Sequence, residues 1–316
     1  MSYTNNTGVS LLMAVWLVND DYDHDDRSNY ISVTTLIKSV RQIVLAARVK
    51  PDDAPVDIVS LAKSRIGQAI HTAIERAWKD NFKSAMALLN YPKKVIDRIE
   101  INPVSPGPDT LAVYIEQRVE RDFGGVLLGG KYDMIILGKL SDVKSTSVWS
   151  YINGSSIGKW KLQGSIYRLL NQDKVTDDHL FVQYVFTDWS GAAVGTRPGY
   201  PATPILELPV PLLSVSETER YINNKLQELR QHWNAPEMEL PLCTDEDLWR
   251  DPPVYKYYAG DPKLAKKSTK NFDNMHDANA HRSAAGKGVI VPVPGIPRAC
   301  TYCKAFNLCS QKNQYF

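Results

Sequence analysis

The stretch between Lys131 and Thr146 constrains the fold of this chain more than any other part of the sequence. Two runs rich in Ile, Leu, Val and Tyr, Lys131–Leu137 and Lys139–Thr146, lie on either side of Gly138. Runs of this length and composition predict β-strands, and a glycine between them predicts the tight turn of a hairpin. We therefore expect two neighbouring strands here.

Three charged residues of this hairpin form a candidate metal site. Asp142 and Lys144 are two residues apart, so they project from one face of their strand, and the hairpin can bring Asp133 alongside them. Two close carboxylates repel unless a divalent cation lies between them, and such oxygen ligands suit Mg²⁺ or Mn²⁺ better than Zn²⁺. The cation can acidify a bound water and polarise a phosphate. The alternative is a surface hairpin with an ordinary ion-pair pattern.

A helix with one apolar face is predicted before the hairpin. Ser64–Trp78 has helical periodicity, and its apolar positions share a face: Ile66, Ile70, Ile74 and Ala77. His71 and Glu75, four residues apart, lie on another face. His71 can reach a metal held by the hairpin; alternatively, it is a histidine of the helix surface or of the core.

A second helix and another strand flank the hairpin. Lys159–Asn171 also has helical periodicity, and Gln163 and Tyr167, four residues apart, share a face that can line the groove beside the metal. Glu116 lies in the predicted strand Leu111–Arg121, where it either faces the site or is an exposed strand glutamate. Helices on both faces of a mixed sheet are the expected result.

The order and spacing of these residues resemble the RecB-like branch of the PD-(D/E)XK nucleases. The resemblance covers roughly residues 30 to 190. It rests on a helix, two strands and a following helix that carry these residues: Gly67, His71, Glu75, Gly130, Asp133, Asp142, Val143, Lys144, Gln163 and Tyr167. It implies an α/β, restriction-endonuclease-like fold, in which a mixed sheet is flanked by helices.

The resemblance also implies a role for each matched residue. In that family the histidine, the two acidic residues and the lysine form the metal site. The glutamine and the tyrosine of the following helix contact the nucleic acid or position the scissile strand. The implied ligands of Mg²⁺ or Mn²⁺ are His71, Asp133 and Asp142. The implied catalytic residues are Asp133, Asp142, Lys144, Gln163 and Tyr167.

Four cysteines form a second candidate metal site. Cys300, Cys303 and Cys309 lie close together in the sequence, and the fourth is Cys243. In a chain with no secretory signal, thiols so placed favour metal ligation over disulfides. Four thiolates suit a [4Fe-4S] cluster or a tetrahedral Zn²⁺. Structurally inert cysteines are the remaining alternative.

The spacing of the last three cysteines is similar to that of cluster ligands in known nucleases. AddB-type helicase-nucleases and CRISPR-associated Cas4 nucleases, which carry a [4Fe-4S] cluster, share it. In those relatives the first cysteine precedes the nuclease motifs, but the corresponding stretch here, Ser32–Val49, contains none. Cys243 either takes that place in space or helps to bind Zn²⁺ in a C-terminal knuckle.

The C-terminal part of the chain differs in composition from the rest. Residues 241–316 contain many prolines and little periodicity, so they are not expected to bury enough apolar surface to fold alone. We expect a nuclease core at 1–235 and a cysteine module at 236–316 that metal ligation holds to the core. Basic and aromatic residues of this module either bind a nucleic-acid strand or form a solvated loop. They are Lys263, Lys266, Lys267, Lys270, Tyr255, Tyr257, Tyr258 and Phe272.

The composition allows a core but does not identify a partner. A chain of 316 residues with 43% hydrophobic content can bury a large domain. A net charge of +2 is close to neutral, so it gives no independent support for a nucleic-acid partner. Leu11–Val18 is apolar but short and meets the acidic run Asp20–Asp26. It is therefore expected to be neither a membrane span nor a secretion signal, and a cytoplasmic location follows.

The remaining segments predict further elements and loops. We expect helices at 33–48, 82–90 and 217–232, the last capped by Ser216. Strands are expected at 95–101, 111–121, 125–137, 139–147, 179–188 and 203–209. Asp20–Ser28 and Asp273–Lys287 are expected to be loops.

Together these features predict an enzyme, a metal-dependent exonuclease that hydrolyses phosphodiester bonds in DNA end processing or recombination. Compact members of this branch without a helicase domain occur in phage and CRISPR systems, so a phage-encoded protein would act in the host cytoplasm. This chain likewise lacks a G-x-x-x-x-G-K-[ST] loop. The expected partners are DNA ends with a helicase or a single-strand annealing or recombination protein, and no membrane. The alternatives are a structure-selective endonuclease on the same site and a DNA-binding or assembly protein with a vestigial site.

Overall fold

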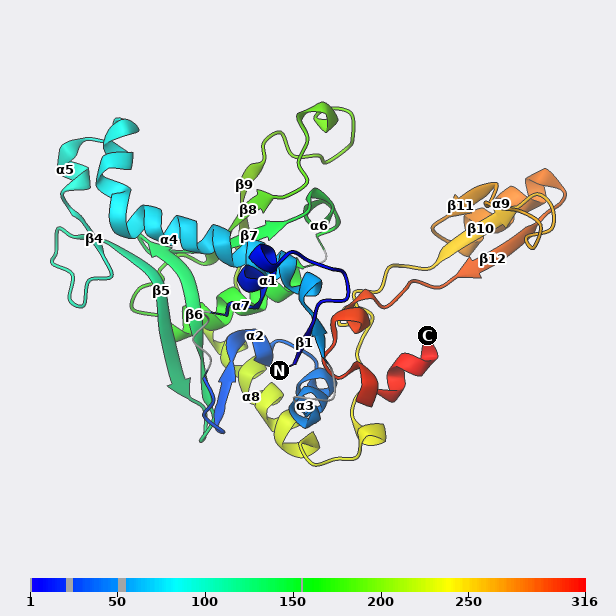
Figure 1. The fold of residues 1–316 in the computed structure, drawn as a ribbon, viewed down its shortest axis with the longest axis horizontal. Helices are drawn as coiled ribbons and strands as arrows, with labels where there is room; N and C mark the ends of the chain where they lie inside the picture. The colour runs from blue at the N-terminus through cyan, green and yellow to red at the C-terminus, as the bar shows by residue number, and fades with distance from the viewer. Residues whose placement is uncertain (1, 21–24, 51–54, 155) are drawn as a thin grey trace. The chain divides into compact units, whose positions relative to one another are not determined.

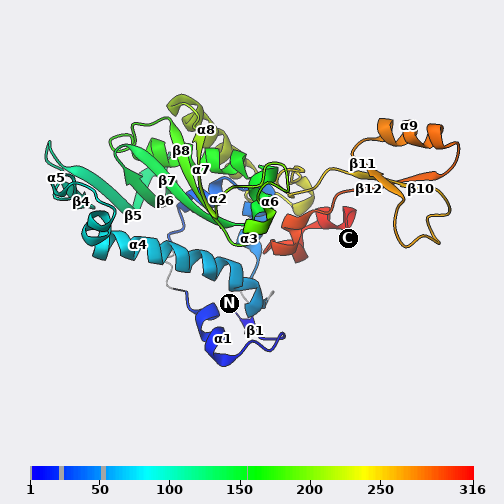
Figure 2. The ribbon, with the colours of Figure 1, turned by 90° about the horizontal axis from the view of Figure 1, so that it is seen from above.

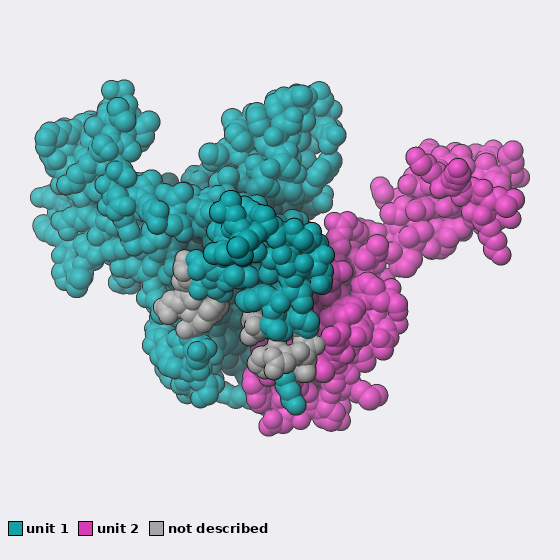
Figure 3. Space-filling model, in the orientation of Figure 1, with its two compact units in different colours: residues 1–38, 50–230 teal, residues 39–49, 231–316 magenta. Residues whose placement is uncertain are grey.

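The chain forms two compact units. The computed structural model describes residues 2–20, 25–50, 55–154 and 156–316. Residues 1–38 and 50–230 make up unit 1, and residues 39–49 and 231–316 make up unit 2 (Figure 3). A short segment from the N-terminal half of the chain, 39–49, therefore belongs to the same unit as the C-terminal residues.

A curled mixed sheet forms the centre of unit 1 (Figure 1). In the part of the chain that the structure describes, it has seven strands in the order β4-β5-β6-β7-β8-β9, with β2 paired to β6. The pair β7 and β8 is parallel, whereas β6 is antiparallel to both β5 and β7. The strands are β2 (Tyr30–Ser32), β4 (Ile99–Ile101), β5 (Leu111–Asp122), β6 (Leu127–Ile136), β7 (Lys139–Thr146), β8 (His179–Phe186) and β9 (Ile205–Pro211). With helices on its sides, unit 1 has the predicted mixed α/β architecture.

The strands β6 and β7 form the predicted hairpin. Leu137 and Gly138 connect them, and their φ angles are 50° and 80°. Positive φ at both positions is the backbone of a two-residue turn whose twist matches that of the strands. The two strands pair only at Met134–Ile136 and Lys139–Ser141. Beyond these residues β6 pairs with β2 and β7 pairs with β8, so the hairpin strands separate.

One long helix, α4 (Ala62–Leu88), lies along one side of the sheet (Figure 2). The prediction of a separate helix at 82–90 was wrong, because apolar residues continue at helical spacing through α4: Ile74, Trp78, Phe82 and Met86. They pack on a buried cluster from the first three strands of the sheet: Ile99, Val113, Ile115 and Met134. The short helix α5 (Lys93–Ile96) occupies the start of the strand predicted at 95–101.

The connection from β7 to β8 is helical. It contains α6 (Val148–Asn153) and α7 (Ile157–Leu170), and the latter agrees with the helix predicted at 159–171. α7 packs against β8 and β9. Gly164 permits this approach, because a Cβ atom there would lie only 2.9 Å from Leu212 Cδ2.

The helix α8 (Val215–His232) lies on the side of the sheet opposite α4 (Figure 2). Its cap is Ser214 and not the predicted Ser216. The Ser214 hydroxyl accepts the Glu217 N–H at 3.2 Å, and the Glu217 carboxylate accepts the Ser214 N–H at 2.8 Å. This reciprocal capping box starts the helix at Val215.

The helix predicted at 33–48 is two helices. α2 (Val33–Leu36) belongs to unit 1 and α3 (Val40–Arg48) belongs to unit 2. The Ser39 hydroxyl accepts the Gln42 N–H at 3.2 Å, and the Gln42 side chain accepts the Ser39 N–H at 3.3 Å. This capping box begins a new helix at Val40. The prediction of one continuous helix was therefore wrong.

The N-terminal residues form short elements of unit 1. β1 (Tyr3–Thr4) pairs in parallel with β3 (Val56–Asp57), and the apolar stretch forms α1 (Leu11–Val18). The acidic run Asp20–Asp26 and the predicted loop Asp20–Ser28 include residues 21–24, which lie outside the described residues. Among the helices that the structure describes, none combines the length and the apolar character that a membrane crossing requires.

Unit 2 contains a small antiparallel sheet in a segment predicted to have little regular structure. Its strands follow the order β11-β10-β12, and they are β10 (Val254–Tyr258), β11 (Lys270–Phe272) and β12 (Val289–Val293). α9 (Met275–Ala285) contacts all three strands. The prediction of a loop at Asp273–Lys287 was wrong, because Asn274 caps α9 and Gly286 ends it with a φ of 65°.

We call the three strands and α9, residues 254–293, the arm. The chain enters and leaves the arm at neighbouring positions, because Arg250 and Pro297 form an isolated antiparallel bridge. The Arg250 side chain also donates a hydrogen bond to the Gly295 carbonyl at 3.0 Å. The arm is thus an insertion between two segments of the cysteine-bearing part of unit 2.

Candidate metal site and cysteine pocket

The candidate metal site lies where β6 and β7 separate. Asp133 Oδ2 on β6 accepts the backbone N–H of Val143 on β7 at 2.7 Å. The bond gives this N–H a partner where strand pairing has ended, and buried N–H groups need one. It also holds the Asp133 carboxylate between the two strands, within electrostatic range of Asp142 and Lys144.

Three ligand groups converge at this carboxylate. Nδ1 of His71, from α4, lies 3.5 Å from Asp133 Oδ2 and 3.7 Å from Glu116 Oε1. One ligand atom from each of the three residues lies within 4.8 Å of the other two. His71 Nε2 lies 3.1 Å from the Val143 carbonyl oxygen, so Nδ1 is the nitrogen that faces the carboxylates. An imidazole nitrogen with two carboxylate oxygens fits a divalent cation such as Mn²⁺ or Mg²⁺.

Glu116 faces the site, and it does so from a strained backbone. The pairs on either side of it, Ile115 with Met134 and Gln117 with Tyr132, place it opposite Asp133. Its φ is 52°, a value that costs energy for a residue other than glycine and that concentrates at functional sites. Its other carboxylate oxygen lies 2.8 Å from Lys131 Nζ. Sequence patterns left its orientation open, because they do not reveal which residue a strand places opposite Asp133.

Asp142 is a buried carboxylate with few partners. It is 6% exposed, its Oδ1 accepts a hydrogen bond from Gln163 Nε2 at 3.3 Å, and its Oδ2 lies 2.6 Å from Lys144 Nζ. Among the described residues, Oδ2 accepts no well-directed hydrogen bond, so the Lys144 ammonium offsets its charge. The same ammonium lies 6.0 Å from the ring centre of Trp160 on α7. A carboxylate so placed has lone pairs left for a cation.

The charges of the site shift one another. Burial, and then the charge of Asp142, raise the pKa of Asp133 to about 7. Burial would lower the pKa of Lys144, but the two aspartates outweigh burial and raise it. Burial likewise opposes a charge on His71, yet Glu116 and Asp133 raise its pKa above the ordinary value. Close carboxylates of which one resists ionisation are an arrangement that a cation would stabilise.

Two glycines of the matched motif permit close packing around the site. A Cβ atom at Gly67 would lie 3.2 Å from Ser145 Oγ, so α4 approaches β7 closely at this point. A Cβ atom at Gly130 would lie 2.6 Å from the Tyr167 hydroxyl. That hydroxyl donates to the Lys131 carbonyl at 3.0 Å, and the Tyr167 side chain is buried. Tyr167 therefore packs against β6, whereas Gln163 bonds the Asp142 carboxylate directly.

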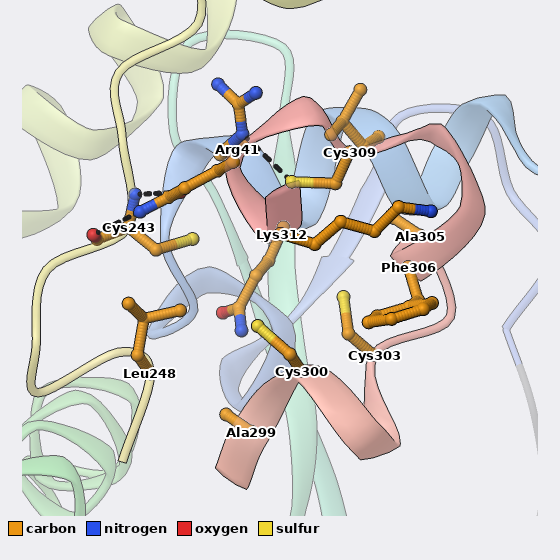
Figure 4. Close-up of a pocket in the computed structure, with 13 residues that line it drawn as sticks. Arg41, Cys243, Leu248, Ala299, Cys300, Cys303, Ala305, Phe306, Cys309 and Lys312 are labelled. Carbon is orange, nitrogen blue, oxygen red and sulfur yellow. Dashed lines mark hydrogen bonds between the residues drawn. The ribbon is translucent and has the colours of Figure 1, made fainter. Parts of the chain in front are cut away.

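The four cysteines line one pocket of unit 2 (Figure 4). Cys300 and Cys303 come from a 3₁₀ turn and its end, Cys309 follows another such turn, and Cys243 comes from a segment without regular secondary structure. Their sulfur atoms point toward a common space (Figure 4). Residues of α3 line the same pocket. The structure thus brings Cys243 together with the other three, a signal that sequence spacing alone did not contain.

A buried arginine from α3 lies beside the sulfurs. Arg41 is 1% exposed, its Nε donates to Cys309 Sγ at 3.2 Å, and it forms an ion pair with Glu237. Cys243 Sγ lies 3.2 Å from the Ser39 hydroxyl. Burial raises the pKa of Cys243 to about 11, so the thiol keeps its proton at neutral pH unless a metal replaces it. The sequence did not indicate this role for Arg41, because nothing in residues 40–48 showed that α3 belongs to the same unit as the cysteines.

The donor set suits either of the two candidate metals. All four cysteines are among the described residues, and each is a free thiol. Tetrahedral Zn²⁺ and a [4Fe-4S] cluster both take four cysteine thiolates. The Arg41 N–H directed at Cys309 Sγ is a contact that a metal-bound sulfur can also accept.

The basic and aromatic residues predicted to bind a nucleic-acid strand lie in the arm. Lys263, Lys266 and Lys267 are exposed on the connection between β10 and β11. Tyr257 is buried, and its ring packs edge-on against His281 of α9 with a centroid distance of 4.8 Å. The lysines are accessible to a polyanion, whereas Tyr257 belongs to the core of the arm and is not available to stack on a base.

Comparisons with known proteins place this chain in no family. No protein-family model matches it, and no curated protein sequence is similar to it at a significant level. One solved structure that it resembles is the crystal structure of SSO0001, at 18% sequence identity and a TM-score of 0.41. The match covers 69% of this chain and 83% of that one. A similarity this low assigns neither a family nor an activity.

Proposed function

We propose that the protein is a metal-dependent nuclease of restriction-endonuclease-like architecture that hydrolyses phosphodiester bonds at DNA ends. The observation that carries the proposal is the convergence of His71, Glu116 and Asp133 within 4.8 Å of one another. The buried Asp142 pairs with the half-buried Lys144 on β7. Carboxylates and an imidazole beside an ammonium are suited to phosphoryl chemistry with a divalent cation.

His71, Glu116 and Asp133 would hold the cation, with Asp142 as a further carboxylate. When bound, Mg²⁺ or Mn²⁺ supplies charge that polarises a phosphate and acidifies a water. The Lys144 ammonium, which pairs with Asp142, would offset negative charge that develops on the phosphate. A lysine on an exposed surface would offset this phosphate charge less well, because charges interact more strongly where water is scarce.

Gln163 acts through Asp142 and is a positioning residue. Its amide holds Asp142 Oδ1 at 3.3 Å and leaves Oδ2 to Lys144. The matched tyrosine, Tyr167, bonds the Lys131 carbonyl, and Lys131 in turn pairs with Glu116. Both residues of α7 thus orient the strands that carry the charged groups, which is the support that a catalytic constellation needs.

We also propose a [4Fe-4S] cluster at the four cysteines, with Zn²⁺ as the alternative. The support is the common pocket of the four thiols and the Arg41 N–H directed at Cys309. Such a cluster would join α3 to residues near the other end of the chain. It would therefore act on stability and on the shape of unit 2 rather than on hydrolysis.

The test is digestion of end-labelled DNA, linear and circular, single- and double-stranded, with Mg²⁺ or Mn²⁺. Lys144→Ala removes the ammonium, and Lys139→Ala removes an exposed lysine from the same strand as a matched control. We expect metal-dependent loss of linear DNA that persists in Lys139→Ala and vanishes in Lys144→Ala. Cutting of closed circles would show that the activity is that of an endonuclease and not of an exonuclease. No cleavage of any substrate by protein that retains its cysteine-bound metal would overturn the proposal and favour a binding or assembly role.

A further inference from the structure

A cavity of unit 1 lies at the carboxyl ends of β7 and β8. It is lined by residues of α6 and of the connection between β8 and β9, and its volume is about 340 Å³. This is at the small end of the range for ligand pockets, about 300–1,000 Å³, and far above the space of one water. It can hold one planar ring system but no folded partner.

An aromatic ring and a guanidinium form one wall of this cavity. Trp149 lines it and is 50% exposed, and the Arg197 guanidinium lies over its ring at 5.4 Å from the centroid. Tyr200 lines it as well, and its hydroxyl accepts the Ser190 N–H at 2.8 Å. A half-exposed indole beside a planar cation is suited to stacking on a planar, neutral ring.

One hydrogen bond joins the two sides of the cavity, and another lies within the connection between β8 and β9. The Asp188 carboxylate accepts the Val148 N–H, at the first turn of α6, at 2.7 Å. On the other side, Trp189 Nε1 donates to the Pro201 carbonyl at 3.0 Å. The first bond uses Asp188 Oδ1 within the protein, and Arg197 supplies a cationic group to the lining. A pocket fixed before binding loses little entropy when it is filled.

The cavity is close to the candidate metal site along the chain. Val148 follows Lys144 by four residues, so their Cα atoms are at most about 14 Å apart. Both residues lie toward the carboxyl ends of the parallel strands β7 and β8, where ligands of open α/β sheets bind. A nucleic-acid strand rises about 3.4 Å per nucleotide when stacked. A strand with a phosphate at Lys144 would therefore reach the cavity within about four nucleotides.

We propose that this cavity receives one unstacked nucleobase of the strand whose phosphate lies at the metal site. Trp149 stacks on the base, and Arg197 covers it or binds the phosphate next to it. The inference rests on the proposed nuclease function and adds to it a subsite for a single-stranded end. It selects strands with a displaced base, because a base within a duplex cannot enter a cavity of this size.

Binding measurements test the subsite without depending on cleavage. In a Lys144→Ala background, fluorescence anisotropy with Mn²⁺ and a labelled single-stranded oligonucleotide reports affinity. We expect Trp149→Ala to weaken binding about tenfold and Trp149→Phe to restore most of it, as for other stacking residues. The matched control is Trp233→Ala, which removes a tryptophan of similar exposure, 48%. Equal affinity for Trp149→Ala and the control would overturn the proposal.

An abasic nucleotide moved along the oligonucleotide locates the subsite. With Trp149 present, we expect the affinity for the oligonucleotide to fall when the abasic nucleotide occupies one particular position. That position should lie within about four nucleotides of the site that the native protein cuts. With Trp149→Ala, that fall should disappear, because the base no longer has a partner. The same loss at every position, or competition by a free nucleoside monophosphate with no position effect, would overturn a strand-bound base. If the native protein cuts nothing, the proposed activity fails while the position effect still decides the subsite.

Discussion

The Asp133 carboxylate destabilises the protein when no cation is bound. Burial and Asp142 raise its pKa to about 7, whereas an aspartate in an unfolded chain has a pKa of about 3.9. As pH rises from about 4 to about 7, the unfolded chain loses this proton and the folded chain keeps it. The free energy of unfolding therefore falls over this range, and the loss is complete above pH 7.

Replacing Asp133 tests this account. We predict that Asp133→Asn raises the melting temperature of the metal-free protein at pH 8 by several degrees, since each pKa unit corresponds to about 1.4 kcal/mol. The amide oxygen can still accept the Val143 N–H. Calorimetry with a chelator and then with Mn²⁺ measures both effects, and Mn²⁺ should stabilise only the native protein. Equal stabilisation of both proteins by Mn²⁺ would contradict the ligand assignment.

Glu116 offers a second test at the residue scale. Its carboxylate lies within the group of ligand atoms, so Glu116→Gln should weaken Mn²⁺ binding by about tenfold or more, as measured by isothermal titration calorimetry. Glu75→Gln is the matched control, because Glu75 lies on α4 one turn after His71 but pairs with Lys79 at 2.6 Å. A similar affinity for both variants would remove Glu116 from the site.

The residues of the site were only partly predictable. The alternation of a strand placed Asp142 and Lys144 on one face, since this depends on two neighbouring positions. Glu116 could not be assigned in the same way, because its place opposite Asp133 depends on the pairing of β5 with β6. Arg41 was invisible for a related reason: its contact with Cys309 joins positions 268 residues apart.

Among the elements, apolar patterns gave correct predictions, whereas a missed capping box and tertiary contacts gave the exceptions. The hairpin followed from two apolar runs and Gly138, and α7 followed from its periodicity. The break between α2 and α3 comes from the Ser39 capping box, which sequence alone placed inside one helix. α4 is longer than predicted, because apolar residues at helical spacing continue through its second half and pack on β4, β5 and β6.

The packing of α7 under β6 can be tested through Gly130. A Cβ atom at this position would lie 2.6 Å from the Tyr167 hydroxyl, so Gly130→Ala should destabilise the protein by about 1–3 kcal/mol. Tyr167→Phe removes that oxygen and its bond to Lys131, at a cost of about 1 kcal/mol. The double variant should therefore be more stable than the sum of the two predicts. Additive losses in urea denaturation would show that the contact is absent.

At the scale of the whole molecule, the cysteine pocket predicts a metal that stabilises unit 2. Protein purified without oxygen should contain about four iron atoms per chain, and Cys303→Ser should lose the iron and melt at a lower temperature. Metal analysis and thermal denaturation measure these effects. One zinc per chain would replace the cluster by the alternative metal, and unchanged stability of Cys303→Ser would contradict a structural role for either.

The arm predicts a salt-dependent contribution to DNA binding. Lys266 and Lys267 are adjacent and exposed on the arm, and if both contact phosphates, replacing them with Gln reduces the slope of log K against log salt by roughly 1–2. The matched control replaces Lys93 and Lys94, an adjacent exposed pair in unit 1. Binding isotherms from low to high salt measure the slopes. Equal slopes for the two double variants would mean that the arm lies outside the binding surface.

The placement of α3 has a consequence for how the protein is made. On the ribosome, Arg41 is synthesised 268 residues before Cys309, which corresponds to roughly 15–50 s at about 5–20 residues per second. During that interval the nascent chain can complete the sheet of unit 1 while the buried face of α3 has no partner. The cysteine pocket therefore closes late in biogenesis, and a prematurely terminated chain would display α3 to chaperones and proteases.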